Sequence, residues 1–173
     1  MVLARGQRGL GHALLYSFFT RITDDVDYVG KNKTFKKQNI DFVVDGSVFY
    51  GTRVDLRARP FLSFETIAKF DEKGVIREYG WVQNNKAHFT IMIRRDNFDW
   101  IMYFFQPGEI LTEIKNNPGY GVRYKTNGVL KEFYNIPLTY FSHKKPVRIP
   151  IVGEPDVSGL AFVHDYAKEY LAF

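Results

Sequence analysis

Apolar positions near the start of the chain recur at spacings of three and four residues. Residues 7–23 carry six of them, and this spacing places them on one face of an α-helix. They are Leu10, Leu14, Leu15, Phe18, Phe19 and Ile22. The same spacing returns in residues 107–117 and in residues 158–173. The pattern therefore predicts three helices.

After the first helical segment the pattern changes to short runs of β-branched and aromatic residues separated by turn residues. Five or more such runs, including residues 75–83, lie between residues 40 and 106, and we interpret residues 24–39 as a loop. A further hairpin is predicted over residues 119–138, because Asn127-Gly128 is a strong two-residue turn signal. A helix followed by successive strands indicates an α+β domain. We expect a mainly antiparallel or mixed central sheet of about five strands, flanked by helices.

The length of 173 residues suits one compact domain with a terminal extension. We assign residues 1–142 to the α+β domain and residues 143–173 to an extended C-terminal arm that ends in a short helix. Three of the seven prolines fall in residues 143–155, which favours an extended backbone there. The arm either completes the same core or docks on a partner subunit, and the second alternative would make a homo-oligomer.

The composition is that of a globular protein with an excess of basic side chains. The formal net charge is +5, which favours an anionic partner, and nucleic acid is the commonest one. Aromatic residues make up 17% of the chain, and some of them are available to stack on bases. The candidate phosphate contacts are Lys33, Lys36, Lys37, Arg94, Arg95, Lys144 and Lys145. The alternative is that these side chains are solvated surface charge.

The absence of cysteine excludes disulfides and thiolate metal sites, so a metal site would be built from carboxylate and carbonyl oxygens. No apolar run is long enough to span a bilayer, and the first residues lack a secretory pattern. We therefore expect an intracellular, cytoplasmic protein without a membrane partner.

Three charged residues at a predicted hairpin form the strongest candidate for a chemical site. Asp41 heads one strand, and Asp55 and Arg57 end the returning strand. Because side chains two positions apart on a strand share a face, Asp55 and Arg57 point to the same side. Phosphodiester cleavage by a divalent ion requires two such carboxylates to converge on the ion, with a cation nearby.

The hairpin geometry sets a condition on this site. A tight turn at residues 45–46 would pair Asp41 with Tyr50. Asp55 would then lie about five residues further along, roughly 16 Å away in a straight strand. A bend at Gly51, or a wider loop, is needed to bring the two carboxylates together.

The order of five features between residues 36 and 115 resembles the PD-(D/E)XK nuclease-like superfamily, in particular its compact phage and mobile-element members. The features are KKQNIDF, VDLRA, SFET, GWVQNNKAH and the aromatic strand WIMYFF, which leads into a short helix. The resemblance implies a restriction-endonuclease-like fold and a DNA endonuclease dependent on Mg²⁺ or Mn²⁺. For a phage protein it also implies the host cytoplasm.

The same resemblance implies roles for individual residues. Asp41 and Asp55 look like the metal-binding acids, and Arg57 occupies the place of the catalytic lysine. Glu65 looks like an accessory acid, and Lys86 is placed to face the phosphate backbone. Arginine keeps its proton and presents a planar fork, so Arg57 suits clamping a phosphate better than transferring a proton.

Three functions stay open at this point. The first is metal-dependent DNA hydrolysis at Asp41 and Asp55, with Arg57 stabilising the scissile phosphate. The second is a protein of the same fold that binds nucleic acid, or acts in assembly, without catalysis. In that case Asp55 and Arg57 form an ion pair. The third is a phage protein–protein module that oligomerises. The resemblance favours DNA over RNA as the partner.

Overall fold

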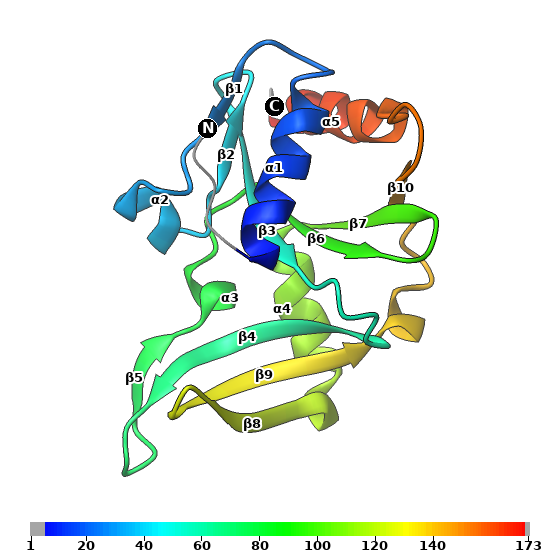
Figure 1. Ribbon diagram of the computed structural model, residues 1–173. Coiled ribbons are helices and arrows are strands. Elements are labelled where there is room, and N and C mark those ends of the chain that lie inside the picture. The colour runs from blue at the N-terminus through cyan, green and yellow to red at the C-terminus, as the bar shows by residue number, and fades with distance from the viewer. Residues whose placement is uncertain (1–5, 172–173) are drawn as a thin grey trace.

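The computed structural model describes residues 6–171 and has an α+β fold, as the hydrophobic pattern predicts. Its strands form two separate sheets, of six and four strands (Figure 1). The prediction of one central sheet of about five strands is therefore wrong in the number of sheets. The chain leaves the first sheet after Val54 and enters the second at Phe61. Pro60 directly precedes this entry, and it has no N–H to donate to a strand ladder.

The first sheet is mixed, in the order β1-β2-β3-β6-β7-β10. Neighbouring strands are antiparallel except for the parallel pair β3 and β6. Its strands are β1 (Val26–Tyr28), β2 (Phe42–Val44), β3 (Val48–Val54), β6 (Phe89–Arg95), β7 (Asp99–Phe105) and β10 (Val147–Pro150). Strand β1 lies in the segment that we predicted as a loop.

The second sheet is antiparallel, in the order β5-β4-β9-β8. Its strands are β4 (Phe61–Phe70), β5 (Ile76–Tyr79), β8 (Gly121–Thr126) and β9 (Val129–Pro137). The predicted hairpin is confirmed, because Asn127 and Gly128 join β8 to β9 with φ values of 51° and 78°.

The three predicted helices are confirmed as α1 (Gln7–Phe19), α4 (Pro107–Asn116) and α5 (Ser158–Leu171). Two short helices were not predicted. They are α2 (Lys33–Lys37), which Asn32 caps with its side chain, and α3 (Trp81–Asn84), where we predicted the end of a strand. Two 3₁₀ turns, η1 (Pro118–Tyr120) and η2 (Leu138–Phe141), flank the β8–β9 hairpin.

Each sheet has its own hydrophobic core. The first core lies between the six-stranded sheet and helices α1 and α5, where Leu15, Phe19 and Tyr50 are fully buried. The second core lies between the four-stranded sheet and α4, around Phe64 and Ile110, and it also includes Met92 and Phe105 from β6 and β7 of the first sheet. The chain thus forms an upper lobe and a lower lobe in the orientation of Figure 1.

The C-terminal arm packs on the upper lobe. Strand β10 pairs with β7, and Leu160 and Ala167 of α5 are fully buried in the first core. The arm therefore completes the core of its own chain. Among residues 6–171, no helix has the length and apolar character needed to cross a bilayer.

Candidate functional site

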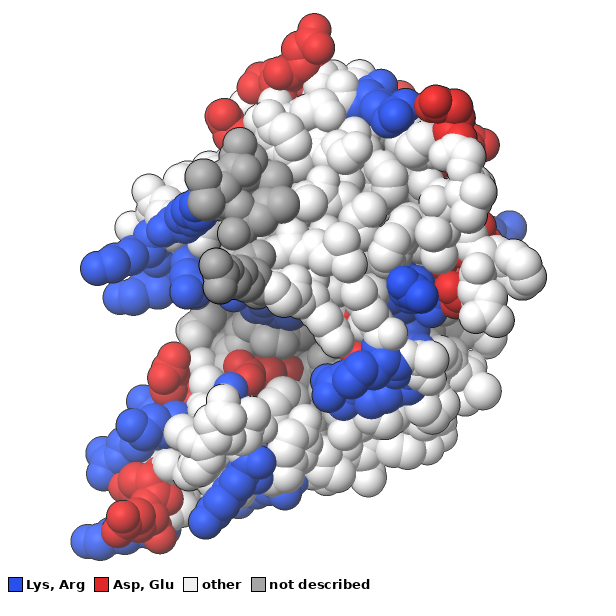
Figure 2. All heavy atoms as spheres, in the orientation of Figure 1, with Lys and Arg blue, Asp and Glu red and all other residues white. Residues whose placement is uncertain are grey.

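A groove runs between the two lobes. It consists of two hollows, of about 600 Å³ and about 460 Å³, which share Arg8, Arg53, Glu65 and Trp81 as lining residues and are therefore continuous. Figure 2 shows the molecule hollowed between the lobes, with basic side chains on the rims. Within the described part of the chain, seven basic and three acidic side chains line the two hollows. Six of the sequence-predicted site residues line this groove, namely Lys36, Lys37, Asp55, Arg57, Glu65 and Arg94.

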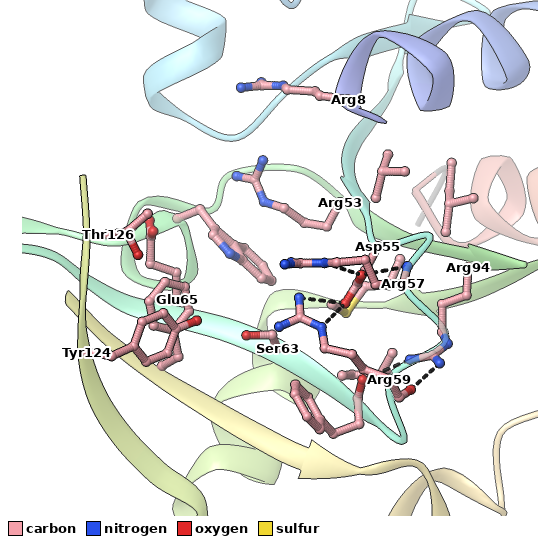
Figure 3. A pocket seen from close by; sticks show the side chains of 17 residues that line it. Arg8, Arg53, Asp55, Arg57, Arg59, Ser63, Glu65, Arg94, Tyr124 and Thr126 are labelled. Atoms are coloured by element: carbon pink, nitrogen blue, oxygen red, sulfur yellow. Dashed lines mark hydrogen bonds and ion pairs between the residues drawn. The ribbon is translucent and has the colours of Figure 1, made fainter. Parts of the chain in front are cut away.

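One wall of the groove carries arginine side chains. Arg8 comes from α1, Arg53 from β3, and Arg57 and Arg59 from the loop that follows β3 (Figure 3). Lys36 and Lys37, at the end of α2, line the second hollow. We call Arg8, Arg53, Arg57 and Arg59 the arginine wall.

The opposite wall is one face of the four-stranded sheet. Because side chains alternate along a strand, Phe64 of β4 enters the second core, whereas Ser63 and Glu65 face the groove. The next strands add Tyr124, Thr126 and Phe133 to this wall. The rings of Tyr124 and Phe133 stack on each other, with centroids 4.7 Å apart and planes inclined by 10°. Glu65 accepts a hydrogen bond of 3.0 Å from Lys131 Nζ.

Asp41 is buried beneath the arginine wall. Its Oδ1 accepts a 3.1 Å hydrogen bond from Arg8, and its Oδ2 accepts a 2.8 Å bond from the backbone N–H of Thr52. His12 Nε2 lies 3.4 Å from Oδ1, which is longer than a usual hydrogen bond. Burial alone would raise the pKa of Asp41, but His12, Arg8 and Arg53 outweigh burial and lower that pKa. The carboxylate is therefore ionised and already compensated.

Asp55 is held by two arginines of the wall (Figure 3). Arg59 donates to Oδ2 at 2.7 Å, and Arg57 contacts Oδ1 through its backbone N–H at 3.1 Å and its Nε at 3.4 Å. Burial would raise the pKa of Asp55, and these arginine contacts lower it further than burial raises it. Asp55 therefore fixes the direction of the two guanidinium groups.

The structure keeps Asp41 and Asp55 apart. The turn between β2 and β3 holds three residues, and Phe42 pairs with Tyr50, so Asp41 lies opposite Gly51. Strand β3 runs in regular register from Tyr50 to Val54 without a bulge. Asp55 is thus four residues further along an extended strand, roughly 13 Å away.

This donor set does not fit a divalent ion. A hard cation of this kind takes several oxygen ligands at one point. Here each carboxylate is paired with a guanidinium group instead. Across residues 6–171 no three acidic or histidine side chains gather as a metal-binding group.

Arg53 joins the two hollows. Its guanidinium lies 4.8 Å from the ring centroid of Trp81 and donates to the side chain of Asn39. Burial lowers the pKa of Arg53 to about 10, although Asp41 opposes this shift, so the side chain stays charged at neutral pH. The groove therefore contains a desolvated cation packed on an aromatic ring, and desolvation strengthens the attraction between this cation and an anion.

The remaining predicted residues differ in whether they line the groove and in what they contact. Lys36, Lys37 and Glu65 line the groove. Lys33, Lys86, Arg95 and Lys145 are exposed and do not line it. Arg94 lies at the edge of the groove but is buried, and it donates to the carbonyls of Arg59 and Phe61. Lys144 donates to Glu109 of α4 and to the carbonyl of Phe104 on β7, so it joins the segment after η2 to both elements.

Several groove residues were not identified from the sequence, namely Arg8, Arg53, Arg59, Trp81, Tyr124 and Phe133. A usable signal existed for two of them. Residues 53–59 read Arg-Val-Asp-Leu-Arg-Ala-Arg, which places charges at every second position and hence on one face of an extended chain. The other four depend on contacts between segments that are distant in sequence.

Comparison with protein-family models, with curated proteins and with solved structures finds no match to this chain.

Proposed function

We propose that this protein binds nucleic acid in the groove between its lobes, and that binding needs no divalent ion. The arginine wall is the observation that carries the proposal. Four guanidinium groups from α1, β3 and the following loop face one hollow. Arginine forks match phosphate oxygens in geometry, and contacts to phosphate supply most of the affinity in nucleic-acid complexes.

The proposal retains the DNA ligand and the restriction-endonuclease-like ancestry that the resemblance to PD-(D/E)XK nucleases implies, and it omits the metal chemistry. Asp41 and Asp55 have roles that need no metal, since each neutralises or orients arginines. Arg57 uses its backbone N–H and Nε on Asp55, and its side chain is 65% exposed. Its two terminal amino groups make no hydrogen bond to a described residue, so they can reach a phosphate.

The first test measures how binding depends on salt and on magnesium. A fluorescently labelled DNA oligonucleotide is titrated with the protein at several salt concentrations, with EDTA or with Mg²⁺. We expect equal affinity in both, and a logarithm of the binding constant that falls linearly with the logarithm of salt concentration. Arg57→Ala should weaken binding and reduce the magnitude of that slope by about 1, which corresponds to the loss of one phosphate contact.

Arg148→Ala is the matched control. Arg148 is also an exposed arginine in ion pairs, with Asp96 and Asp99, but it lies on β10 and does not line the groove. Its replacement should leave the affinity within about twofold of wild type, because exposed ion pairs contribute little. An equal loss in both variants would show that binding is unrelated to the groove.

Asp55→Asn separates binding from cleavage. In a binding groove the change removes a negative charge beside the phosphate path, and we expect DNA affinity to rise by about two- to fivefold at low salt. In a metal-dependent nuclease the same change abolishes cleavage. Plasmid nicking by the wild type in Mg²⁺ or Mn²⁺ that disappears in Asp55→Asn would contradict the proposal.

A further inference from the structure

The two walls of the groove differ in chemistry. The upper wall carries guanidinium groups, whereas the lower wall carries the stacked pair Tyr124 and Phe133 together with neutral polar groups. Two acids line the groove from the four-stranded sheet: Glu65, which is paired with Lys131, and Glu78 of β5, which lines the second hollow. An anionic backbone is therefore attracted to the upper wall and finds no unpaired cation on the lower wall among the lining residues.

Tyr124 is placed to contact a ligand. It lies on β8, an edge strand of the four-stranded sheet, and its side chain is 39% exposed although it lines the groove. One face of its ring covers Phe133. Stacking of bases on such aromatic side chains tolerates any sequence, because every base has a π-face.

We infer that the groove takes a single-stranded polynucleotide, with its phosphates on the arginine wall and its bases against Tyr124 and Phe133. This inference rests on the proposed function and adds the strandedness and orientation of the ligand. A single strand presents charge on one side and free base faces on the other, which matches the two walls. A duplex buries its base faces in its own stack and presents phosphates on its outside.

The size of the groove agrees with this ligand. Its larger hollow, of about 600 Å³, falls within the range of pockets that enclose drug-sized molecules. Such a space accommodates a few nucleotide units rather than a turn of duplex. The second hollow, with Lys36 and Lys37, continues the path beyond Arg53.

The test compares four labelled or competing ligands on the full chain. They are single-stranded DNA, single-stranded RNA and duplex DNA of one length, and inorganic polyphosphate, which has the charge but no bases. We expect both single strands, or one of them, to bind more tightly than the duplex. Tyr124→Ala should weaken single-strand binding by about 5- to 100-fold, the usual range for removing one stacked base contact. Tyr124→Phe, which retains the ring, should bind like wild type.

Polyphosphate binding tests the charged wall alone, and so distinguishes the proposed function from the inferred stacking of bases. Its affinity should be unchanged in Tyr124→Ala and reduced in Arg57→Ala, because it uses only the charged wall. Tyr170→Ala is the control for replacing an exposed tyrosine, since Tyr170 is 55% exposed on α5 and lies outside the groove. Thermal unfolding of each variant checks that the fold is retained.

Two results would overturn the inference while leaving the proposed function intact. One is a duplex that binds more tightly than either single strand. The other is a Tyr124→Ala variant with wild-type affinity for single strands. If neither oligonucleotides nor polyphosphate bind, the proposed function itself fails. The RNA and DNA arms identify which single strand is the ligand.

Discussion

Asp41 is an acid that is only 1% exposed, and its surroundings define its role. The carboxylate accepts from the Thr52 N–H and pairs with Arg8 of α1. His12 lies beside it, and the Nδ1 atom of His12 lies 2.9 Å from the Tyr28 hydroxyl. The residue thus joins α1 to the hairpin of β2 and β3. Removing one member of a buried ion pair leaves the other charge buried without a partner, and this lowers the stability of the fold.

Asp41→Asn should therefore destabilise the fold. We expect the free energy of unfolding to fall by about 2–4 kcal/mol, because Arg8 and Arg53 lose their nearby negative charge and a hydrogen bond weakens. Urea unfolding measures this loss, and Asp165→Asn, an exposed acid on α5, serves as the control. If Asp41→Asn were as stable as wild type, or more stable, the Asp41 carboxylate would not stabilise the fold. Such a carboxylate is typical of a metal site.

At the scale of elements, the groove depends on how closely the segment after α2 approaches β3. Asn39 has a φ of 59° and is 3% exposed. Its amide donates to Asn85 and Thr90, and its oxygen accepts from Arg53. A Cβ atom on Gly51 would lie 2.2 Å from the Asn39 carbonyl oxygen. Glycine at position 51 therefore permits the contact that positions Arg53.

Gly51→Ala should lower both stability and binding. The new methyl group forces Asn39 and β3 apart, at a cost of about 1–3 kcal/mol, and displaces Arg53 in the groove. Gly108→Ala is the matched control, because a Cβ there meets nothing within 4 Å and alanine favours a helix. Thermal unfolding and DNA titration check both effects. Wild-type behaviour of Gly51→Ala would show that the approach of Asn39 to β3 is not required.

At the scale of the whole molecule, long-range contacts tie the C-terminal helix to the first lobe. His164 is fully buried, with Nδ1 2.9 Å from the Tyr50 hydroxyl and Nε2 2.8 Å from Asp45. A hydrogen bond from Thr23, together with His164 and Lys168, lowers the pKa of Asp45 to about 2 against a smaller opposing effect of burial. Asp45 thus ties α5 to the turn between β2 and β3.

These contacts predict acid sensitivity. The pKa values of Asp41 and Asp45 are lowered in the folded state, so their stabilisation is fully present above the unfolded value of about 4. It is lost as the pH falls below about 4 and the folded carboxylates take up protons, which for Asp45 occurs at its folded pKa of about 2. Urea unfolding between pH 7 and pH 2.5 should show this decline, and Asp45→Asn should make it shallower. A stability that is flat over this range would contradict the prediction.

Local patterns in the sequence were sufficient for several parts of this protein. The three long helices and the Asn127-Gly128 hairpin follow from spacing and turn chemistry, which act over a few residues. The alternation of charges from Arg53 to Arg59 was also present in the sequence, but only Asp55 and Arg57 were identified from it. The basic composition indicated an anionic partner, which remains a prediction.

Only the tertiary structure decided what faces those side chains. The split into two sheets, the pairing of Arg8 with Asp41 across 33 residues and the position of Tyr124 opposite the arginine wall all depend on contacts distant in sequence. The periodicity of apolar and polar residues predicts which side of a strand a residue occupies, but it does not predict which segment packs against that side. The separation of Asp41 from Asp55 was set in the same way, by a three-residue turn and a strand without a bulge.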